Sequence, residues 1–474
     1  MPFSTLRNSV LARAPVLRQI IETSGKLPLS VYCQQHLGGP PRVSAARQEE
    51  VFSAVRQCVS RVLGASAAAE AEAHLRQHYL VSTGDHHHPL THPFSLNSAL
   101  LRSAALRGAG RRSLVTFSCA TVSLNNSSSP RGLLYHSRRL QAHRLPLFSL
   151  QYRHHPVYGL RAYTAVELAR ARHMVQAEKN ITPVDRALLD EILVSVYADP
   201  AVLACQYYSE QITRTNAALW RRLPGQADTT LIFVPEEDMV NDLLARYHLA
   251  GQSTAVTALL TDPTAVQLFC QEFNGVAGAG SLDRSKGTIL FWALREGQRL
   301  ALWLDGDRLV SADGQYAVAL SASALTQALQ QKELMPSMAL TFIVLSFYYG
   351  LTCGGGFFQG SYLAQMRQAY VRLLSALRAS AEDTAAASAA ATDRITADLS
   401  FIHLAKGSDL TLASALDLLL YQDDQTPTRL VALMERCTLA EAIDQLMPLF
   451  YTIFYHTPPP VSAPRPAYDA LLYV

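Results

Sequence analysis

A histidine-rich loop carries the most conspicuous chemical groups of the sequence. Residues 81–94 read VSTGDHHHPLTHPF and hold four histidines and one aspartate. Such a cluster could bind a metal ion, contact a phosphate or nucleotide, or transfer protons in catalysis, because the ordinary pKa of imidazole lies near neutrality. It could also be a polar loop whose imidazoles bond to each other and to water. A purification tag is excluded, since the cluster lies well inside the chain.

The position of the loop favours a ligand or catalytic role. It follows a β-prone run, HYLVS, and precedes residues 94–106, which can form a helix; a β-rich run, LVTFSCATVSL, comes next. Strand, loop, helix and strand in this order are typical of a parallel sheet. In such sheets ligands bind where strands end and helices begin. We therefore predict catalytic residues and binding residues in the loop: Asp85, His86, His88 and His92 for catalysis, Thr83 and Gly84 for binding substrate or nucleotide.

A divalent metal ion is an alternative for the same loop. Three imidazoles and a carboxylate would suit zinc or another divalent ion. The ligands would then be His86, His88 and His92, although their spacing matches no known zinc motif. In an extended loop, successive side chains point in opposite directions. At most two of the three consecutive histidines 86–88 can therefore face one site.

Two further segments offer polar groups or close backbone approach. SLNNSSSPRGLLYH, residues 123–136, directly follows the second predicted strand, and its amides, serine hydroxyls and guanidinium could position a substrate or could simply form a turn. The glycines of TCGGGFFQG allow a backbone to approach a ligand closely. The predicted binding residues of these segments are Asn125, Asn126, Arg131, Gly354, Gly355 and Gly356.

The rest of the chain divides into three predicted parts. Residues 1–77 form an N-terminal helical segment and residues 78–378 an α/β core. This core contains a helical insertion at about 164–220 and, where β-prone runs alternate with glycine-containing breaks, a β meander at about 287–320. Residues 379–474 hold an alanine-rich linker or helix, C-terminal helices and a tail too rich in proline for regular structure. The predicted fold class is α/β: a Rossmann-like open parallel sheet with helical insertions, a small antiparallel β meander and a helical C-terminal part.

Composition limits the partners. The chain has 474 residues with a formal charge of +3, too near balance for a protein that binds nucleic acid by neutralising phosphates. Its seven cysteines form no CxxC pair, which favours a reducing cytoplasm. The most apolar segment, residues 338–351, is shorter than the roughly 20 residues of a membrane span. Neither nucleic acid nor a membrane is an expected partner.

The order of these motifs resembles one known family, the cysteine-adding enzyme of bacillithiol biosynthesis. That family has a Thr-Gly loop followed by Gln-Pro-Gly and ending in Gly-Pro, on which Thr83, Gly84 and Pro93 match. Its later Gly-Gly stretch and Tyr-x-Ala-Gln are echoed by Gly355, Gly356, Tyr362, Ala364 and Gln365. The sequence departs from the pattern in two places: histidines 86–88 replace Gln-Pro-Gly, and Gln359 replaces a glutamate.

The resemblance implies a function as well as a fold. It implies a nucleotide-using ligase or transferase that joins an amino acid, cysteine in that family, to a small-molecule acceptor. ATP or another nucleotide would be the cofactor, Gln359 would join the binding residues, and the C-terminal helices would promote a homodimer. The substituted motif leaves two other classes open: a metal-dependent enzyme that uses the histidine cluster, and a non-catalytic binding protein on the same fold.

Overall fold

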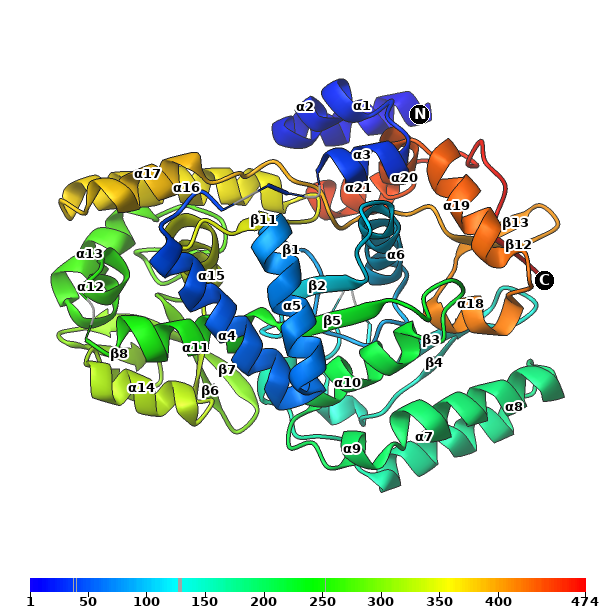
Figure 1. Cartoon of the computed structure of the whole chain (residues 1–474), viewed down its shortest axis with the longest axis horizontal. Helices are drawn as coiled ribbons and strands as arrows, with labels where there is room; N and C mark the ends of the chain where they lie inside the picture. The colour runs from blue at the N-terminus through cyan, green and yellow to red at the C-terminus, as the bar shows by residue number, and fades with distance from the viewer. Residues whose placement is uncertain (37, 40, 127–129, 252) are drawn as a thin grey trace.

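Four parallel strands form the central sheet of the computed structural model, which describes residues 1–36, 38–39, 41–126, 130–251 and 253–474 (Figure 1). The spatial order is β11-β1-β2-β5, and each neighbouring pair is parallel. The strands are β1 (Leu80–Ser82), β2 (Ser113–Ser118), β5 (Thr230–Pro235) and β11 (Thr352–Gly354). This is the predicted open parallel sheet.

The strand order creates a switch point between β1 and β11. From β1 the chain proceeds to β2 and β5 on one side, and β11 is added later on the other side. Connections therefore leave β1 and β11 in opposite directions, which opens a crevice at the carboxyl ends of the strands. The histidine loop, which directly follows β1, lies at this edge.

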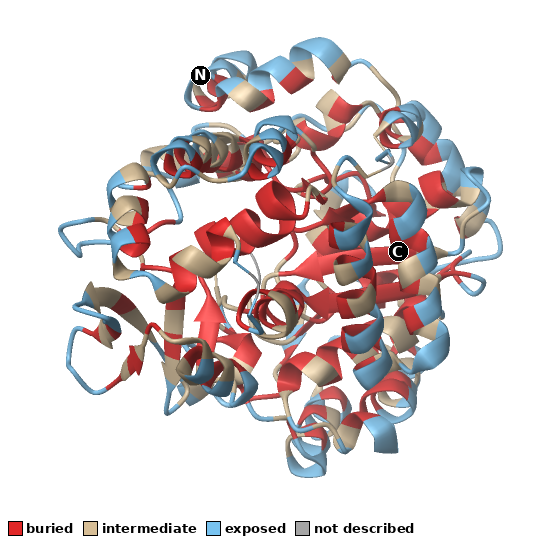
Figure 2. Cartoon of the chain, turned by 60° about the vertical axis from the view of Figure 1, so that its left-hand side comes forward, coloured by how far each residue is buried: buried red, intermediate tan, exposed pale blue. Residues whose placement is uncertain are grey.

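Helices cover both faces of the sheet and bury two apolar cores (Figures 1 and 2). Along β2, Leu114 belongs to one core while Val115 and Phe117 belong to the other, as the two-residue alternation of a strand requires. One face packs against α6 (Pro93–Gly108) and α10 (Tyr208–Trp220), the other against α4 (Ala45–Leu63), α5 (Ala65–His78) and α11 (Glu236–Leu243).

The helical insertion and the meander form as the sequence patterns indicate. The insertion contains α7 (Ala165–Ala177), α8 (Pro183–Ile192), the π-helical turn η3 (Leu193–Tyr197), α9 (Pro200–Leu203) and α10. The antiparallel sheet has the order β10-β6-β7-β8-β9. Its strands are β6 (Phe291–Arg295), β7 (Gln298–Asp305), β8 (Arg308–Ser311), β9 (Ala317–Ala319) and β10 (Leu334–Pro336).

The remaining helices complete the two ends of the molecule (Figure 1). At the N-terminus, α1 (Phe3–Arg13), α2 (Pro15–Ser24) and α3 (Leu29–Gln35) precede α4. Between β5 and β11 the chain forms η4 (Leu244–His248), α12 (Ala255–Thr261), α13 (Pro263–Glu272), α14 (Ala322–Gln330), α15 (Met338–Phe342) and η5 (Ile343–Tyr348). After β11 follow α16 (Gln359–Ala376), α17 (Ala381–Ala389), α18 (Ala415–Tyr421), α19 (Thr426–Arg436), α20 (Leu439–Asp444) and α21 (Met447–Tyr455).

Two small sheets differ from the expectations. After the polar turn that the sequence suggested, the chain forms a hairpin of β3 (Leu133–His136) and β4 (Ala142–Leu145). The proline-rich tail returns to regular structure, because Leu471 and Leu472 are buried and β14 (Leu472–Tyr473) pairs with β12 (His403–Lys406), which also pairs with β13 (Asp409–Leu412). Short η1 (Leu150–Tyr152) and η2 (Val157–Gly159) turns follow β4.

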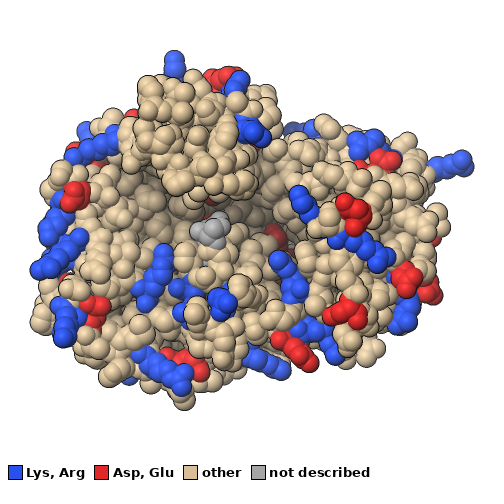
Figure 3. Space-filling model, turned by 180° about the vertical axis from the view of Figure 1, so that it is seen from behind, with Lys and Arg blue, Asp and Glu red and all other residues tan. Residues whose placement is uncertain are grey.

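Three further observations concern the surface, the helices and the cysteines. Both basic and acidic side chains are scattered over the face in Figure 3, which also has a central hollow. None of the described helices is both long and apolar enough to cross a membrane. The seven cysteines are all free thiols.

Candidate functional site

A cavity of about 310 Å³ lies at the switch point of the sheet. Both sequence motifs reach it, since the histidine loop and the glycine-rich segment after β11 supply parts of its wall. The lining residues fall into four chemical groups: the carboxyls Asp85, Glu236 and Asp398; the imidazoles His86, His88 and His92; the rings and apolar groups Phe94, Val122, Met338, Phe342, Phe358 and Tyr362; and Thr83, Gly84, Ser95, Cys119, Gly356 and Gln359.

The four parallel strands position this wall directly. The residue that follows the last residue of β1, β2 and β5 lines the cavity in each case: Thr83, Cys119 and Glu236. After β11 the wall residue is Gly356. Carboxyl ends of parallel strands share one edge of a sheet, so four segments far apart in sequence converge there.

Backbone hydrogen bonds hold the histidine loop in an extended form beside β2. The Asp85 carbonyl accepts from the Cys119 amide at 2.9 Å, and the Cys119 carbonyl accepts from the His87 amide at 2.7 Å. On the other side, the Thr83 amide donates to the Gly354 carbonyl at 2.7 Å. The loop therefore continues the sheet for several residues beyond β1.

The extended form divides the three consecutive histidines. His86 and His88 line the cavity. His87 has no exposed surface and points toward the sheet, where its Nδ1 lies 2.7 Å from Ser118 Oγ and its Nε2 lies 2.8 Å from the Ser209 carbonyl oxygen. Its ring stacks on Phe233. His87 is therefore a packing residue, and two of the three histidines face one site.

Burial makes the imidazoles of the loop weak bases. It lowers the pKa of His86 and, together with His92, holds the pKa of His88 well below its usual range. The pKa of His92 falls to about 3 through burial and the nearby Arg144. These rings are neutral at neutral pH, in contrast to the near-neutral pKa of a free imidazole, and they can accept protons only from a strongly acidic partner or a bound ligand.

A chain of hydrogen bonds connects Asp85 with His88. Ser95 Oγ lies 2.9 Å from Asp85 Oδ1 and 3.2 Å from His88 Nε2. His88 Nδ1 lies 2.8 Å from the Pro89 carbonyl oxygen, which requires a proton on Nδ1 and leaves Nε2 as an acceptor. Ser95 has one hydroxyl proton, which it can donate to His88 Nε2 when a protonated Asp85 donates to Ser95 Oγ in turn. Burial raises the pKa of Asp85, which favours this protonated form. The three groups form a path for a proton.

Burial also raises the pKa of the other two cavity carboxyls. Burial and the adjacent Glu237 hold the pKa of Glu236 well above its usual range. Burial raises the pKa of Asp398 to about 6, and Asp85 adds to this effect. No lysine or arginine of the described chain lines the cavity. A cavity with three carboxyls and no fixed cation is suited to a ligand that brings positive charge.

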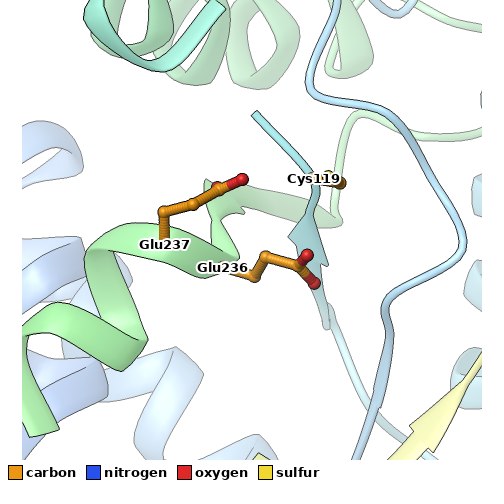
Figure 4. Close-up of side chains that lie close together, drawn as sticks. All are labelled: Cys119, Glu236 and Glu237. Carbon is orange, nitrogen blue, oxygen red and sulfur yellow. The ribbon is translucent and has the colours of Figure 1, made fainter. Parts of the chain in front are cut away.

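The histidines do not converge as metal ligands. Among the described residues, the one group of His, Cys, Asp or Glu whose ligand atoms all lie within 4.8 Å of one another is Cys119, Glu236 and Glu237 (Figure 4). His86, His88 and His92 form no such group with Asp85. The alternative of a histidine metal site therefore has no geometric support in the described part of the chain.

The predicted residues of 123–136 lie mostly outside the main cavity. Asn126 and Arg131 line a neighbouring space of about 20 Å³, large enough for about one water molecule. Asn125 is exposed, and its side-chain oxygen accepts from the Arg131 amide at 2.8 Å. The Arg131 guanidinium donates to the Phe148 carbonyl. The turn interpretation thus describes Asn125 and Arg131 best, while serines 127–129 lie outside the described residues.

The glycine-rich segment contributes more through packing than through direct lining. Gly354 accepts from Thr83, and a side chain on Gly355 would collide with Gln359. The Gln359 amide donates to Thr83 Oγ1 at 2.8 Å, and its Oε1 has no hydrogen-bond partner within the described chain. Gly356 and Gln359 line the cavity, whereas Gly354 and Gly355 support it from behind.

Gly84 allows the two motifs to pack closely, which gives a stability prediction. A Cβ at this position would lie 2.5 Å from the Gly356 amide nitrogen and 2.8 Å from the Gly355 carbonyl carbon. Because backbone cannot move aside locally, we expect Gly84→Ala to lower the free energy of unfolding by about 1–3 kcal/mol. Chemical denaturation measures this, with Gly39→Ala as the control, where a Cβ meets nothing within 4 Å. Equal stability of both variants would contradict the close packing.

Sequence reasoning missed several wall residues. Cys119 and Glu236 were not among the predicted site residues, although each directly follows the end of a strand. Asp398 had no such signal. It reaches the cavity because the Gly355 carbonyl accepts from the Thr396 amide at 2.9 Å, which draws the segment after α17 to the end of β11.

Comparison with known proteins adds no family. No family model matches the chain, and no curated protein sequence matches it. The arguments for its function therefore come from the cavity and from the motifs that form its wall.

Proposed function

We propose that the chain is an enzyme that binds an amino acid or a similar small amine in the switch-point cavity and joins or transfers it to a second small molecule. The observation that carries the proposal is the set of three carboxyls, Asp85, Glu236 and Asp398, in a cavity without lysine or arginine. An ammonium group would supply the missing positive charge, and the aromatic rings Phe94, Phe342 and Phe358 could contact it through their faces.

The same groups supply the acid-base chemistry that such a reaction needs. An amine becomes a nucleophile only after it loses a proton, and an ionised carboxylate beside it, such as Asp398 above pH 6, can accept that proton. The Asp85, Ser95 and His88 chain would carry the proton away from the reacting centre. General acid-base transfer of this kind contributes about 10² to 10⁴ in rate.

The nucleotide that the resemblance implies has weaker physical support than the amine. Phosphate groups would have to be bound by backbone N–H groups at the start of α6 and beside Gly356, or through a divalent cation, because the cavity offers no cationic side chain. ATP, cysteine as the particular amino acid and a homodimer remain predictions from the resemblance.

Calorimetric titration tests the proposed ligand class. We expect cysteine or another amino acid to bind the full-length chain, and its N-acetyl derivative to bind at least about 10-fold more weakly, because acetylation removes the positive charge. Asp398→Asn should weaken amine binding to a similar degree, while the exposed Asp393→Asn should leave it unchanged.

Two results would argue against this function. Equal affinity for free and acetylated amino acids would show that the amino group is not recognised. Amine binding without conversion of any acceptor, in the presence of ATP and magnesium, would favour a non-catalytic binding protein on the same fold.

A further inference from the structure

Three side chains lie together where β2 and β5 end: Cys119, Glu236 and Glu237, referred to below as the Cys-Glu-Glu group. Cys119 follows β2, and the two glutamates begin α11 directly after β5 (Figures 1 and 4). One ligand atom from each residue lies within 4.8 Å of the other two.

The two glutamates are buried without a compensating cation. Glu236 is 4% exposed and Glu237 is 0% exposed, and neither forms an ion pair with a described residue. The next residue shows the contrast: Asp238 lies 3.0 Å from Lys332 Nζ and 3.2 Å from Arg61. Burying charge without a partner is costly, so adjacent unpaired carboxyls must stay protonated or hold a cation.

Hydrogen bonds hold the group in a fixed geometry and leave one ligand atom free. Glu237 Oε1 accepts from the Ala120 amide at 2.8 Å and from the Thr121 amide at 2.6 Å. Glu236 Oε2 is buried and has no hydrogen-bond partner in the described chain. Because such atoms are rare in folded proteins, this oxygen points to a ligand.

The guanidinium of Arg299 does not fill this role. Arg299 lies close enough to influence Cys119 electrostatically. Its Nη1 donates to the Thr121 carbonyl at 3.1 Å, and its guanidinium lies over the Trp292 ring at 4.4 Å from the centroid. The cationic group is therefore directed to a carbonyl and a ring and forms no ion pair with either glutamate.

We propose that the Cys-Glu-Glu group binds one zinc ion, with an open coordination position toward the cavity. Three protein ligands and one exchangeable position are the usual arrangement of catalytic zinc. Two of the ligands, Cys119 and Glu236, line the cavity, so the open position would face a bound substrate. A thiolate among the ligands favours zinc over magnesium or calcium, which prefer oxygen alone. The argument for zinc rests on the geometry of the group and not on the amine proposal, and the two proposals share Glu236.

Titration of zinc chloride into the full-length, tag-free, chelator-treated chain tests the site. We expect one zinc ion per chain, with binding weakened by at least about 100-fold in Cys119→Ser and in Glu236→Gln. Cys205→Ser, which changes a cysteine that does not line the cavity, and the double variant His86→Ala with His88→Ala should bind as the wild type does. Circular dichroism checks that each variant is folded.

Cobalt provides a readout that does not depend on the variants. Co²⁺ in place of zinc should give a thiolate-to-cobalt charge-transfer band in the wild type and in Cys205→Ser. The inference is overturned by a wild type that binds no zinc, by a cobalt complex without this band, or by binding that survives both Cys119→Ser and Glu236→Gln. Loss of binding in the histidine variant alone would also overturn it.

Discussion

Replacing Asp398 by asparagine is expected to raise the free energy of unfolding at pH 7 by up to about 3 kcal/mol. The carboxyl is partly buried in the cavity wall, and its pKa is raised to about 6 from 3.8. The folded chain therefore keeps the Asp398 proton over a range in which the unfolded chain has lost it. The free energy of unfolding falls as pH rises through this range, by about 1.4 kcal/mol for each pH unit, and stays low above pH 6.

Asparagine removes this penalty with little change in shape. It can still accept the bond that Asp398 Oδ2 accepts from the Phe357 amide at 2.7 Å, and it tolerates the positive φ of 57° at this position. Urea denaturation of wild type and Asp398→Asn between pH 3.5 and 7.5 checks the prediction, with Asp393→Asn as the exposed control. The difference should be small at pH 3.5 and largest above pH 6. A difference that does not change with pH would contradict the raised pKa.

Replacing His87 by alanine is expected to destabilise the chain by about 3–5 kcal/mol, whereas His88→Ala should cost about 1 kcal/mol. His87 fills fully buried space against Phe233, and its removal also breaks the hydrogen bonds to Ser118 Oγ and to the Ser209 carbonyl. His88 faces the cavity, and its Nδ1 bonds only to the adjacent Pro89. Adjacent residues of one motif should therefore differ in effect by several kcal/mol.

Urea denaturation at pH 7 measures both values. His88→Ala, although nearly as stable as the wild type, should lose the proton path to Asp85 and with it the turnover of an amine substrate. The related variant His86→Ala is likewise expected to lose turnover and keep its fold. Comparable losses of stability for His87→Ala and His88→Ala would show that the loop is a structural polar cluster throughout.

The sheet and its functional edge could be predicted because their signals are local. A β-prone run followed by a helical pattern and a second β-rich run located β1 and β2, and this order alone placed the loop after β1 at the carboxyl edge of the sheet. Alternation along an extended chain also separated His87 from His86 and His88. The position of the histidine loop directly after a strand was sufficient to predict where the loop lies.

The positions of the remaining site residues depend on long-range contacts that cannot be recognised in the sequence. Asp398 joins the cavity through a backbone pairing of residues 394–396 with Gly355, across more than one intervening helix. Asn125 and Arg131 have the polar groups expected of a site, yet the Asn125 side chain accepts from the Arg131 amide and the Arg131 guanidinium donates to the Phe148 carbonyl. The tail forms β14 because two buried leucines follow the prolines. Such a short strand forms only by pairing with β12.

A crystal structure of the chain soaked with magnesium ATP and an amino-acid mixture tests the central claim most directly. The account predicts density for an amino acid in the switch-point cavity, with its nitrogen within hydrogen-bond distance of Asp85, Glu236 or Asp398. Density with the amino acid's carboxylate against these three carboxyls, or an empty cavity at concentrations that saturate binding in solution, would contradict it.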